Sequence, residues 1–234
     1  MSFWDSHAST IDLDRFRAQE QFLGDQDLNR FPAMLEYIRS LPVDYLWPLR
    51  EDGSFGVVCR EVDGVMMSRD LHDSIVEIDV MSRIFGLPLG SMRVLDVGAG
   101  YGRMAHRMTT MFPGCSFACT DEVAISRRAC EIYLAYHNVN AEIIEPKGYG
   151  RFDLALNIHS WPECTRAQIA SWLDWLHTSQ VTYLFVVPHL DGGFTCYDDG
   201  ASFLPEILRY YAVGRHWRGP AVWPRDMYLF VRTP

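Results

Sequence analysis

Short apolar runs alternate with amphipathic stretches from Arg93 to the end of the chain, and this pattern predicts strands and helices in turn. Such alternation implies parallel strands joined by right-handed crossovers, and therefore an α/β fold. The last link contains Gly219, Pro220 and Pro224 and has no room for a helix, so the final strand is predicted to run antiparallel. We predict strands at 93–97, 116–121, 141–145, 153–158, 181–187, 211–217 and 227–232, and helices near 102–112, 123–137, 165–178 and 202–210.

The residues before this alternation, 1–90, predict a helical extension with a small hairpin, ahead of a core at 91–234. Asp63-Gly64 marks the turn of the hairpin. Ser68 is suited to cap the helix that follows, and Gly86 lies just beyond the end of that helix. The predicted elements are helices at 13–23, 32–41 and 68–85 and a hairpin at 55–67.

Composition narrows the class of protein. The 234 residues carry a formal charge of −9, which argues against a nucleic-acid partner, since such binders usually show a basic face. The strongest basic pair, Arg127 and Arg128, lies on an amphipathic pattern and is interpreted as a solvated helix face. The sequence shows no export signal, no apolar run of membrane length and no C-x-x-C pair. We therefore expect a reduced, cytoplasmic protein with no membrane partner and no zinc site.

The most informative segment is a buried strand that breaks into a glycine-rich turn and then a helix. Glycines let the backbone approach a ligand closely, and the N-terminus of the helix offers unpaired N–H groups. The second strand ends in Asp121, 21 residues after Gly100, where a carboxylate can accept hydrogen bonds from both ribose hydroxyls. The segment is Val94-Leu95-Asp96-Val97-Gly98-Ala99-Gly100-Tyr101-Gly102.

Two positions separate this loop from a nicotinamide-binding one. The third glycine of G-x-G-x-x-G is replaced by Arg103. Asp96 precedes the first glycine by two residues, where its charge would repel a pyrophosphate but suits a cationic sulfonium compound with its ammonium group. The run D-V-G-A-G-Y-G resembles motif I of the class I S-adenosylmethionine-dependent methyltransferases, and the antiparallel last strand resembles the fold of that family. The resemblance covers about residues 90–234.

This resemblance implies a Rossmann-like sheet of strand order 3-2-1-4-5-7-6 and S-adenosylmethionine as the cofactor. It places Asp96, Gly98 and Gly100 at the methionine end of the cofactor, directly or through water, and Asp121 at the ribose. Glu122 is either a substitute for Asp121 or a solvated carboxylate at a helix start. The loop after the third strand lacks the family's common Asp, so the adenine contact stays unnamed. Three further residues complete the predicted cofactor-binding set: Ala99, Tyr101 and Asn157.

The loop after the fourth strand, 156–163, is where the family places acceptor chemistry. It lacks the N/D-P-P-Y/F motif of adenine and glutamine N-methyltransferases and the Pro-Cys nucleophile of cytosine-5 enzymes. Because an alcohol must lose its proton as the methyl group moves, an O-methyltransferase benefits from a general base, most often histidine. His159 is the first candidate, oriented by Glu163 if the loop turns helically, or else a histidine bonded to backbone. His189 is the second candidate, and other histidines, including His72, are interpreted as surface or packing residues.

The loop from 188 to 201 is long and rich in Asp and Gly, which is typical of a lid or binding loop. Asp191, Asp198 and Asp199, together with Asn157, are compatible with an oxygen-rich Mg²⁺ site. Solvated turn acids are the commoner explanation. Mg²⁺ therefore remains an optional second cofactor.

The stretch from Ser68 to Glu77, together with D-V-G-A-G-Y-G and N-I-H-S, resembles the sugar O-methyltransferases of polysaccharide biosynthesis. Within that group it is most similar to enzymes that cap methylmannose polysaccharide precursors at the 1-hydroxyl. The resemblance implies a saccharide or other small-molecule acceptor covered by the N-terminal helices. A small-molecule N-methyltransferase and a non-catalytic cofactor-binding relative remain open alternatives, and so does a homo-oligomer.

Overall fold

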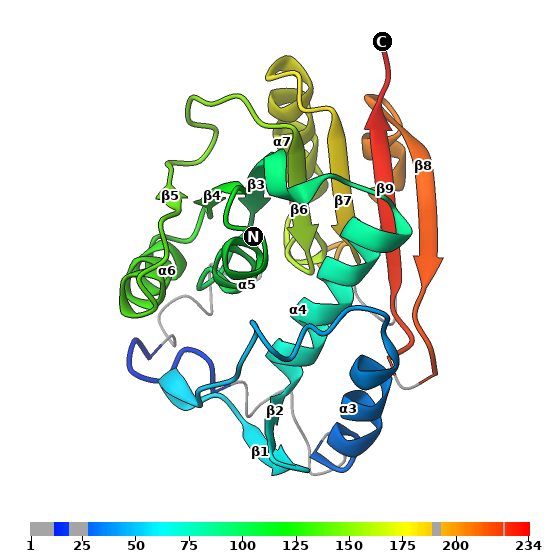
Figure 1. The fold of residues 1–234 in the computed structure, drawn as a ribbon. Helices are drawn as coiled ribbons and strands as arrows, with labels where there is room; N and C mark the ends of the chain where they lie inside the picture. Colours follow the sequence, from blue (N-terminus) through cyan, green and yellow to red (C-terminus); the bar gives the residue numbers. More distant parts are fainter. Residues whose placement is uncertain (1–11, 19–27, 189–192, 222) are drawn as a thin grey trace.

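A seven-stranded mixed sheet forms the centre of the computed structural model, which describes residues 12–18, 28–188, 193–221 and 223–234 (Figure 1). The strands are β3 (Arg93–Val97), β4 (Ser116–Thr120), β5 (Glu142–Ile143), β6 (Leu154–Ile158), β7 (Tyr183–Val187), β8 (Tyr211–Arg218) and β9 (Asp226–Arg232). Their order is β5-β4-β3-β6-β7-β9-β8, and β9 runs antiparallel to both neighbours. The predicted α/β fold, with strand order 3-2-1-4-5-7-6, is confirmed.

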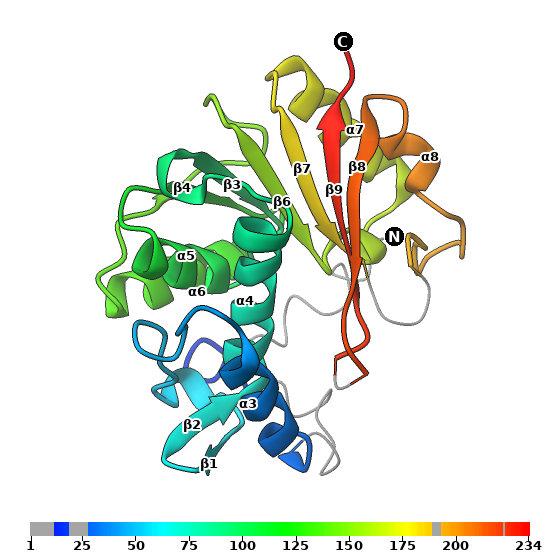
Figure 2. The same cartoon turned by 45° about the vertical axis from the view of Figure 1, so that its right-hand side comes forward.

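Helices cover both faces of the sheet (Figure 2). They are α4 (Arg69–Asp79), α5 (Arg103–Met111) and α6 (Ala124–Tyr136) on one face, and α7 (Arg166–Thr178) and α8 (Leu204–Ile207) on the other. In β7, Phe185 and Val187 face the first group of helices, whereas Leu184 and Val186 face the second. This alternation has the period of two expected of a strand buried on both sides.

The extension shares its core with the sheet. Its elements are α3 (Phe31–Ser40) and the antiparallel hairpin of β1 (Cys59–Val62) and β2 (Val65–Ser68). Ser68 caps α4, because its Oγ accepts a hydrogen bond from the backbone N of Leu71 at 2.9 Å. Buried side chains of α3 and α4 belong to the same apolar cluster as those of α5. The predicted hairpin and the helices on either side of it are confirmed, and a π-helical turn at Val80–Ile84 continues α4.

Three elements depart from the sequence prediction. Residues 13–18, the described part of the helix predicted at 13–23, form turns, so that prediction is wrong there. The cause is tertiary: the backbone N of Arg17 donates to the carbonyl of Phe55 at 3.1 Å, and its side chain is fully buried. The other two are shorter than predicted: the strand at 141–145 is reduced to β5, and the helix at 202–210 to α8.

The extension lies at the edge where the parallel strands end. In Figures 1 and 2, α3 and the β1–β2 hairpin lie on the side toward which the arrowheads of β6 and β7 point. Because β9 is antiparallel to β7, its first residue, Asp226, and the loop before it also reach this edge. Ligands of open α/β sheets bind at the carboxyl ends of the strands. We call this side of the sheet the carboxyl edge.

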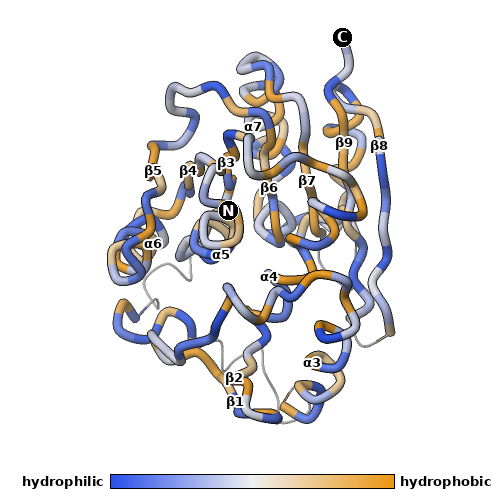
Figure 3. The backbone as a smooth tube through the Cα atoms, viewed as in Figure 1, coloured by the Kyte–Doolittle hydropathy of each residue, from blue (hydrophilic) through white to orange (hydrophobic). Residues whose placement is uncertain are grey.

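The outer strand β8 differs from the central strands. Figure 3 shows hydrophobic colour along much of β6 and β7 and hydrophilic colour along most of β8. Five consecutive residues of β8 are exposed, whereas four of the five residues of β6 are buried. Among the described segments, no helix combines the length and the apolar character needed to cross a membrane.

Candidate functional site

Glycines shape the turn that follows β3. Gly98 has a φ of 78°, and a Cβ placed there would lie 2.2 Å from the Oγ of Ser160, so a side chain would displace the neighbouring loop. Gly100 has a φ of 56°, but a Cβ there meets nothing within 4 Å. The amide of Asn157 donates to the carbonyl of Val97 at 2.9 Å. The glycine loop is therefore held by Ser160 and Asn157 on the side of Gly98, and it has free space on the side of Gly100.

Asp121, just beyond β4, is tied to this loop. Its Oδ2 accepts a hydrogen bond from the backbone N of Gly100 at 3.1 Å, and its Oδ1 accepts one from Val123 at 2.8 Å. Burial raises the pKa of Asp121 to about 6. Each carboxylate oxygen can accept a further hydrogen bond. Asp121 can therefore hold the loop and still receive hydroxyl donors from a ligand.

A small, shallow pocket lies beside Asp121. It is lined by Ala99, Gly100, Cys119, Thr120, Asp121, Arg127, Cys130 and Ile143.

The position of Arg127 differs from its interpretation as part of a solvated helix face. Its guanidinium donates to the carbonyl of Asp121 and lies 3.3 Å from the carboxylate of Glu145 at the mouth of the pocket. Glu145 is 80% exposed, so this ion pair is weak and easily exchanged for a ligand contact. Arg128 is exposed and pairs with Glu131. The solvated-face interpretation is confirmed for Arg128 and wrong for Arg127, because periodicity does not show which of two adjacent arginines turns toward the sheet.

The acids at this site suit a cationic nucleoside. Asp96 is 4% exposed, and burial raises its pKa to about 7, although Arg103 acts in the opposite direction. A nearby cation favours the ionised form of such a carboxyl group. A sulfonium compound with its ammonium group supplies that cation, whereas a dinucleotide pyrophosphate adds further negative charge. The residues present therefore fit S-adenosylmethionine.

The remaining residues of the predicted cofactor set have other contacts. The hydroxyl of Tyr101 donates to Asp70 on α4, so this side chain faces the extension. Glu122 is exposed, accepts a hydrogen bond from Gln168 at 3.4 Å and lies outside the pocket lining. Asn157 is fully buried, and both atoms of its amide are engaged by the chain. Its contacts brace the glycine loop from behind.

His159 follows β6 at the carboxyl edge. Its φ of 65° is uncommon for a residue with a side chain, and its backbone N donates to the end of β7 at 2.9 Å. The side chain of His159 is half-buried. The next residue, Ser160, contacts the glycine loop. A 3-10 turn follows at Trp161–Glu163, so the loop is helical only after His159, and the pairing of His159 with Glu163 stays a prediction. His189 lies outside the described residues.

The acids proposed for Mg²⁺ do not assemble an oxygen-rich site among the described residues. Asp198 and Asp199 are exposed, and their ligand atoms lie within 4.8 Å of one another and of the thiol of Cys196. Thiolates favour softer metals than Mg²⁺. The amide of Asn157 is engaged at the glycine loop, and Asp191 lies outside the described residues. The geometry therefore fits solvated turn acids.

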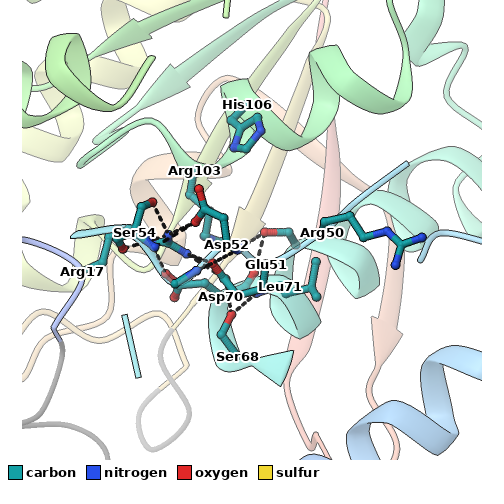
Figure 4. Close-up of polar contacts among 12 residues, drawn as sticks. Arg17, Arg50, Glu51, Asp52, Ser54, Ser68, Asp70, Leu71, Arg103 and His106 are labelled. Carbon is teal, nitrogen blue, oxygen red and sulfur yellow. Dashed lines mark hydrogen bonds and ion pairs between the residues drawn. The ribbon is translucent and has the colours of Figure 1, made fainter. Parts of the chain in front are cut away.

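A buried network joins the extension to the glycine loop. Figure 4 shows three of its members, Arg17, Glu51 and Asp70. Arg17 donates to both oxygens of Glu51 at 3.0 and 2.8 Å, and neither side chain is exposed. Arg17 also donates to Asp70 at 3.4 Å, the carboxylate that accepts from Tyr101. We call Arg17, Glu51, Asp70 and Tyr101 the buried network. The sequence did not reveal it, because its members lie far apart and follow no motif.

Comparison with known proteins supports this architecture. No protein-family model matches the chain, and no curated protein matches it. Solved structures that resemble it include the mitomycin 7-O-methyltransferase MmcR, at 13% identity and a TM-score of 0.52. The alignment with MmcR covers 70% of this chain but only 56% of MmcR.

Two other solved structures are similar over most of their own length. The PH0226 protein of Pyrococcus horikoshii OT3 aligns at 11% identity and a TM-score of 0.53, over 85% of this chain and 99% of that one. A SAM-dependent methyltransferase from Aquifex aeolicus aligns at 17% identity and a TM-score of 0.53, over 67% and 89%. At these identities the likeness concerns the fold alone, and the chain has the fold found in S-adenosylmethionine-dependent methyltransferases.

Proposed function

We propose that this protein is an S-adenosylmethionine-dependent methyltransferase that acts on a hydroxyl of a saccharide or another small molecule. The observation that carries the proposal is the pocket where Gly100 and Asp121 meet, close to the end of β3, which contains the buried Asp96. The likeness in fold to two methyltransferases supports the class. When bound, S-adenosylmethionine supplies an electrophilic methyl group.

The residues around the pocket have distinct roles in this proposal. Asp121 accepts hydrogen bonds from the ribose hydroxyls, and Gly98 and Gly100 let the backbone approach the methionine end. Asp96 lowers the energy of the positive charge of the cofactor. Arg127 lines the pocket, and its weak pair with the exposed Glu145 leaves its guanidinium able to contact the ligand.

A hydroxyl acceptor is favoured by the histidine after β6. His159 would remove the proton of the acceptor hydroxyl during transfer, and Glu163, at the end of the following 3-10 turn, would orient the imidazole. The most specific version of the proposal is that the substrate is a methylated mannoside. Only the resemblance of the segment 68–77 to sugar O-methyltransferases supports this version. An N-methyltransferase would depend less on His159.

The test is a methyl-transfer screen of saccharides, small alcohols and amines, with and without EDTA. Loss of a well-positioned general base typically lowers the rate by about 10² to 10⁴. We therefore expect His159→Ala to reduce kcat by that factor while the melting temperature and the affinity for S-adenosylhomocysteine stay unchanged. His216→Ala is the matched control, because His216 is exposed and pairs with Asp226 on the outer strands.

Several outcomes would contradict the proposal. Methylation of amines but not alcohols would move the protein to the N-methyltransferase alternative. Parallel loss of rate, stability and cofactor affinity in His159→Ala would make this histidine a structural brace. Full activity in EDTA is expected, and recovery of a lost activity by Mg²⁺ would restore a metal to the reaction.

A further inference from the structure

The loop between β8 and β9 packs on α4 at the carboxyl edge. The backbone N of Gly219 donates to the carbonyl of Arg225 at 2.7 Å, which closes the loop. Trp223 is 3% exposed, and its ring meets that of His72 edge-on, with the ring centres 5.8 Å apart. The loop therefore holds two large side chains, Trp223 and Arg225, against the extension.

Arg225 is buried without a hydrogen-bond acceptor. It is 5% exposed, and among the described residues its guanidinium makes no hydrogen bond or ion pair. Its guanidinium carbon lies 5.4 Å from the centre of the Trp223 ring. A desolvated guanidinium is costly unless its N–H groups find acceptors. Burial accordingly lowers the pKa of Arg225.

Two neighbouring polar atoms are in the same condition. The indole Nε1 of Trp223 and the Nε2 of His72 are buried and have no hydrogen-bond partner within the described part of the chain. The indole N–H can only donate. Three polar groups around one loop, from Arg225, Trp223 and His72, thus lack partners at once. Buried groups of this kind in a folded protein call for an acceptor that the chain itself does not supply.

The nearby carboxylates are held by other side chains. Asp73 lies 3.0 Å from the Nδ1 of His72 and 3.4 Å from the guanidinium of Arg69. Glu77 pairs with Arg103 at 2.8 Å. Arg225 therefore lies within electrostatic reach of Asp73 and Glu77, but each of these carboxylates is hydrogen-bonded to another side chain.

The position of this cluster relates it to the acceptor. Arg103 is the first residue of α5, directly after the glycine loop, and its partner Glu77 lies within electrostatic reach of Arg225. The cluster thus lies on the carboxyl edge, on the β9 side of the cofactor pocket and against α4. An acceptor placed between the extension and the sheet would meet it.

We propose that Arg225 and the indole N–H of Trp223 bind an oxyanion group, carboxylate or phosphate, carried by the methyl acceptor, with His72 beside them. The inference rests on the proposed function and adds the chemical class of the acceptor. A guanidinium binds either oxyanion through two parallel hydrogen bonds, whereas it gains little from chloride or a neutral hydroxyl.

The experiment measures melting temperature in sodium acetate and sodium phosphate, against sodium chloride at equal ionic strength. We expect at least one oxyanion to raise the melting temperature of the wild-type protein above the chloride value. Arg225→Gln should abolish this specific rise, and Trp223→Phe, which keeps a ring but lacks the N–H, should reduce it. Arg218→Gln is the matched control, because Arg218 is exposed and pairs with Asp226 near the same loop.

The acetate and phosphate arms distinguish a carboxylate from a phosphate on the acceptor. An equal rise in Arg225→Gln, or no oxyanion-specific rise in the wild-type protein, would overturn the inference. If Arg225→Gln does not fold, Trp223→Phe decides the same question. Binding of S-adenosylhomocysteine by the same samples is measured separately: its absence would refute the proposed function, whereas its presence without an oxyanion effect refutes only this inference.

Discussion

The glycine loop and the buried network meet at one edge of the sheet but are built from different parts of the chain. The loop is held mainly by backbone groups at neighbouring strand ends, as in the 3.1 Å hydrogen bond from Gly100 to Asp121. The buried network consists of three charged side chains and Tyr101, and Arg17 and Glu51 lie 34 positions apart. A site made by the backbone leaves glycines at fixed spacing in the sequence. A site made by distant charges leaves no such pattern.

The largest effect that separates the two regions is expected from Arg17. Replacing one partner of a buried ion pair typically costs about 3 to 5 kcal/mol, because the other charge is left buried and unpaired. Arg17→Ala should lower the free energy of unfolding by about 3 kcal/mol, the lower end of that range, because the fully buried Glu51 keeps Arg107 at 3.4 Å and the hydroxyl of Ser68 as partners. Urea denaturation followed by tryptophan fluorescence measures the change.

A surface ion pair in the same extension provides the control. Arg39 lies 3.1 Å from Asp63, with side-chain exposures of 47% and 72%. Arg39→Ala should cost less than about 1 kcal/mol, as exposed pairs usually do. Similar losses for Arg39→Ala and Arg17→Ala would show that the buried network does not hold the extension on the sheet.

The same difference explains how far the sequence could predict the molecule. β3 was predicted at its observed bounds and α4 at its observed start, because buried apolar runs and a capping serine are local signals. The turn at residues 13–18 was predicted as a helix, since only the buried contacts of Arg17 show otherwise. The contact of His72 with Trp223 was likewise not predictable, because the two residues lie about 150 positions apart in the sequence.

A smaller effect is the pH dependence of stability and cofactor affinity that Asp96, next to the glycine loop, should cause. Burial raises the pKa of Asp96 to about 7, above the unfolded value of about 3.9. Between these values the folded protein binds a proton that the unfolded chain lacks, so the contribution of Asp96 to stability falls as pH rises and levels off above 7. Affinity for the cationic cofactor should change in the opposite direction, rising by at most about tenfold per pH unit through the same range.

The comparison with Asp96→Asn isolates this carboxyl group from others that titrate nearby. The variant should lose both trends, which are read from melting temperatures and from cofactor titrations between pH 5 and 8. Curves for Asp96→Asn that follow those of the wild-type protein would assign the pH dependence to other groups, such as Asp121, whose pKa burial raises to about 6.

The most direct test of the central claim is calorimetry of the wild-type protein with S-adenosylmethionine, S-adenosylhomocysteine and NAD. The pocket beside Asp121 predicts micromolar affinity for the first two, equivalent to about −8 kcal/mol, and no binding of NAD. Asp121→Ala should weaken cofactor binding by about 1 to 3 kcal/mol through lost hydrogen bonds to ribose. Tight binding of NAD, with no heat from either sulfur compound, would contradict the account.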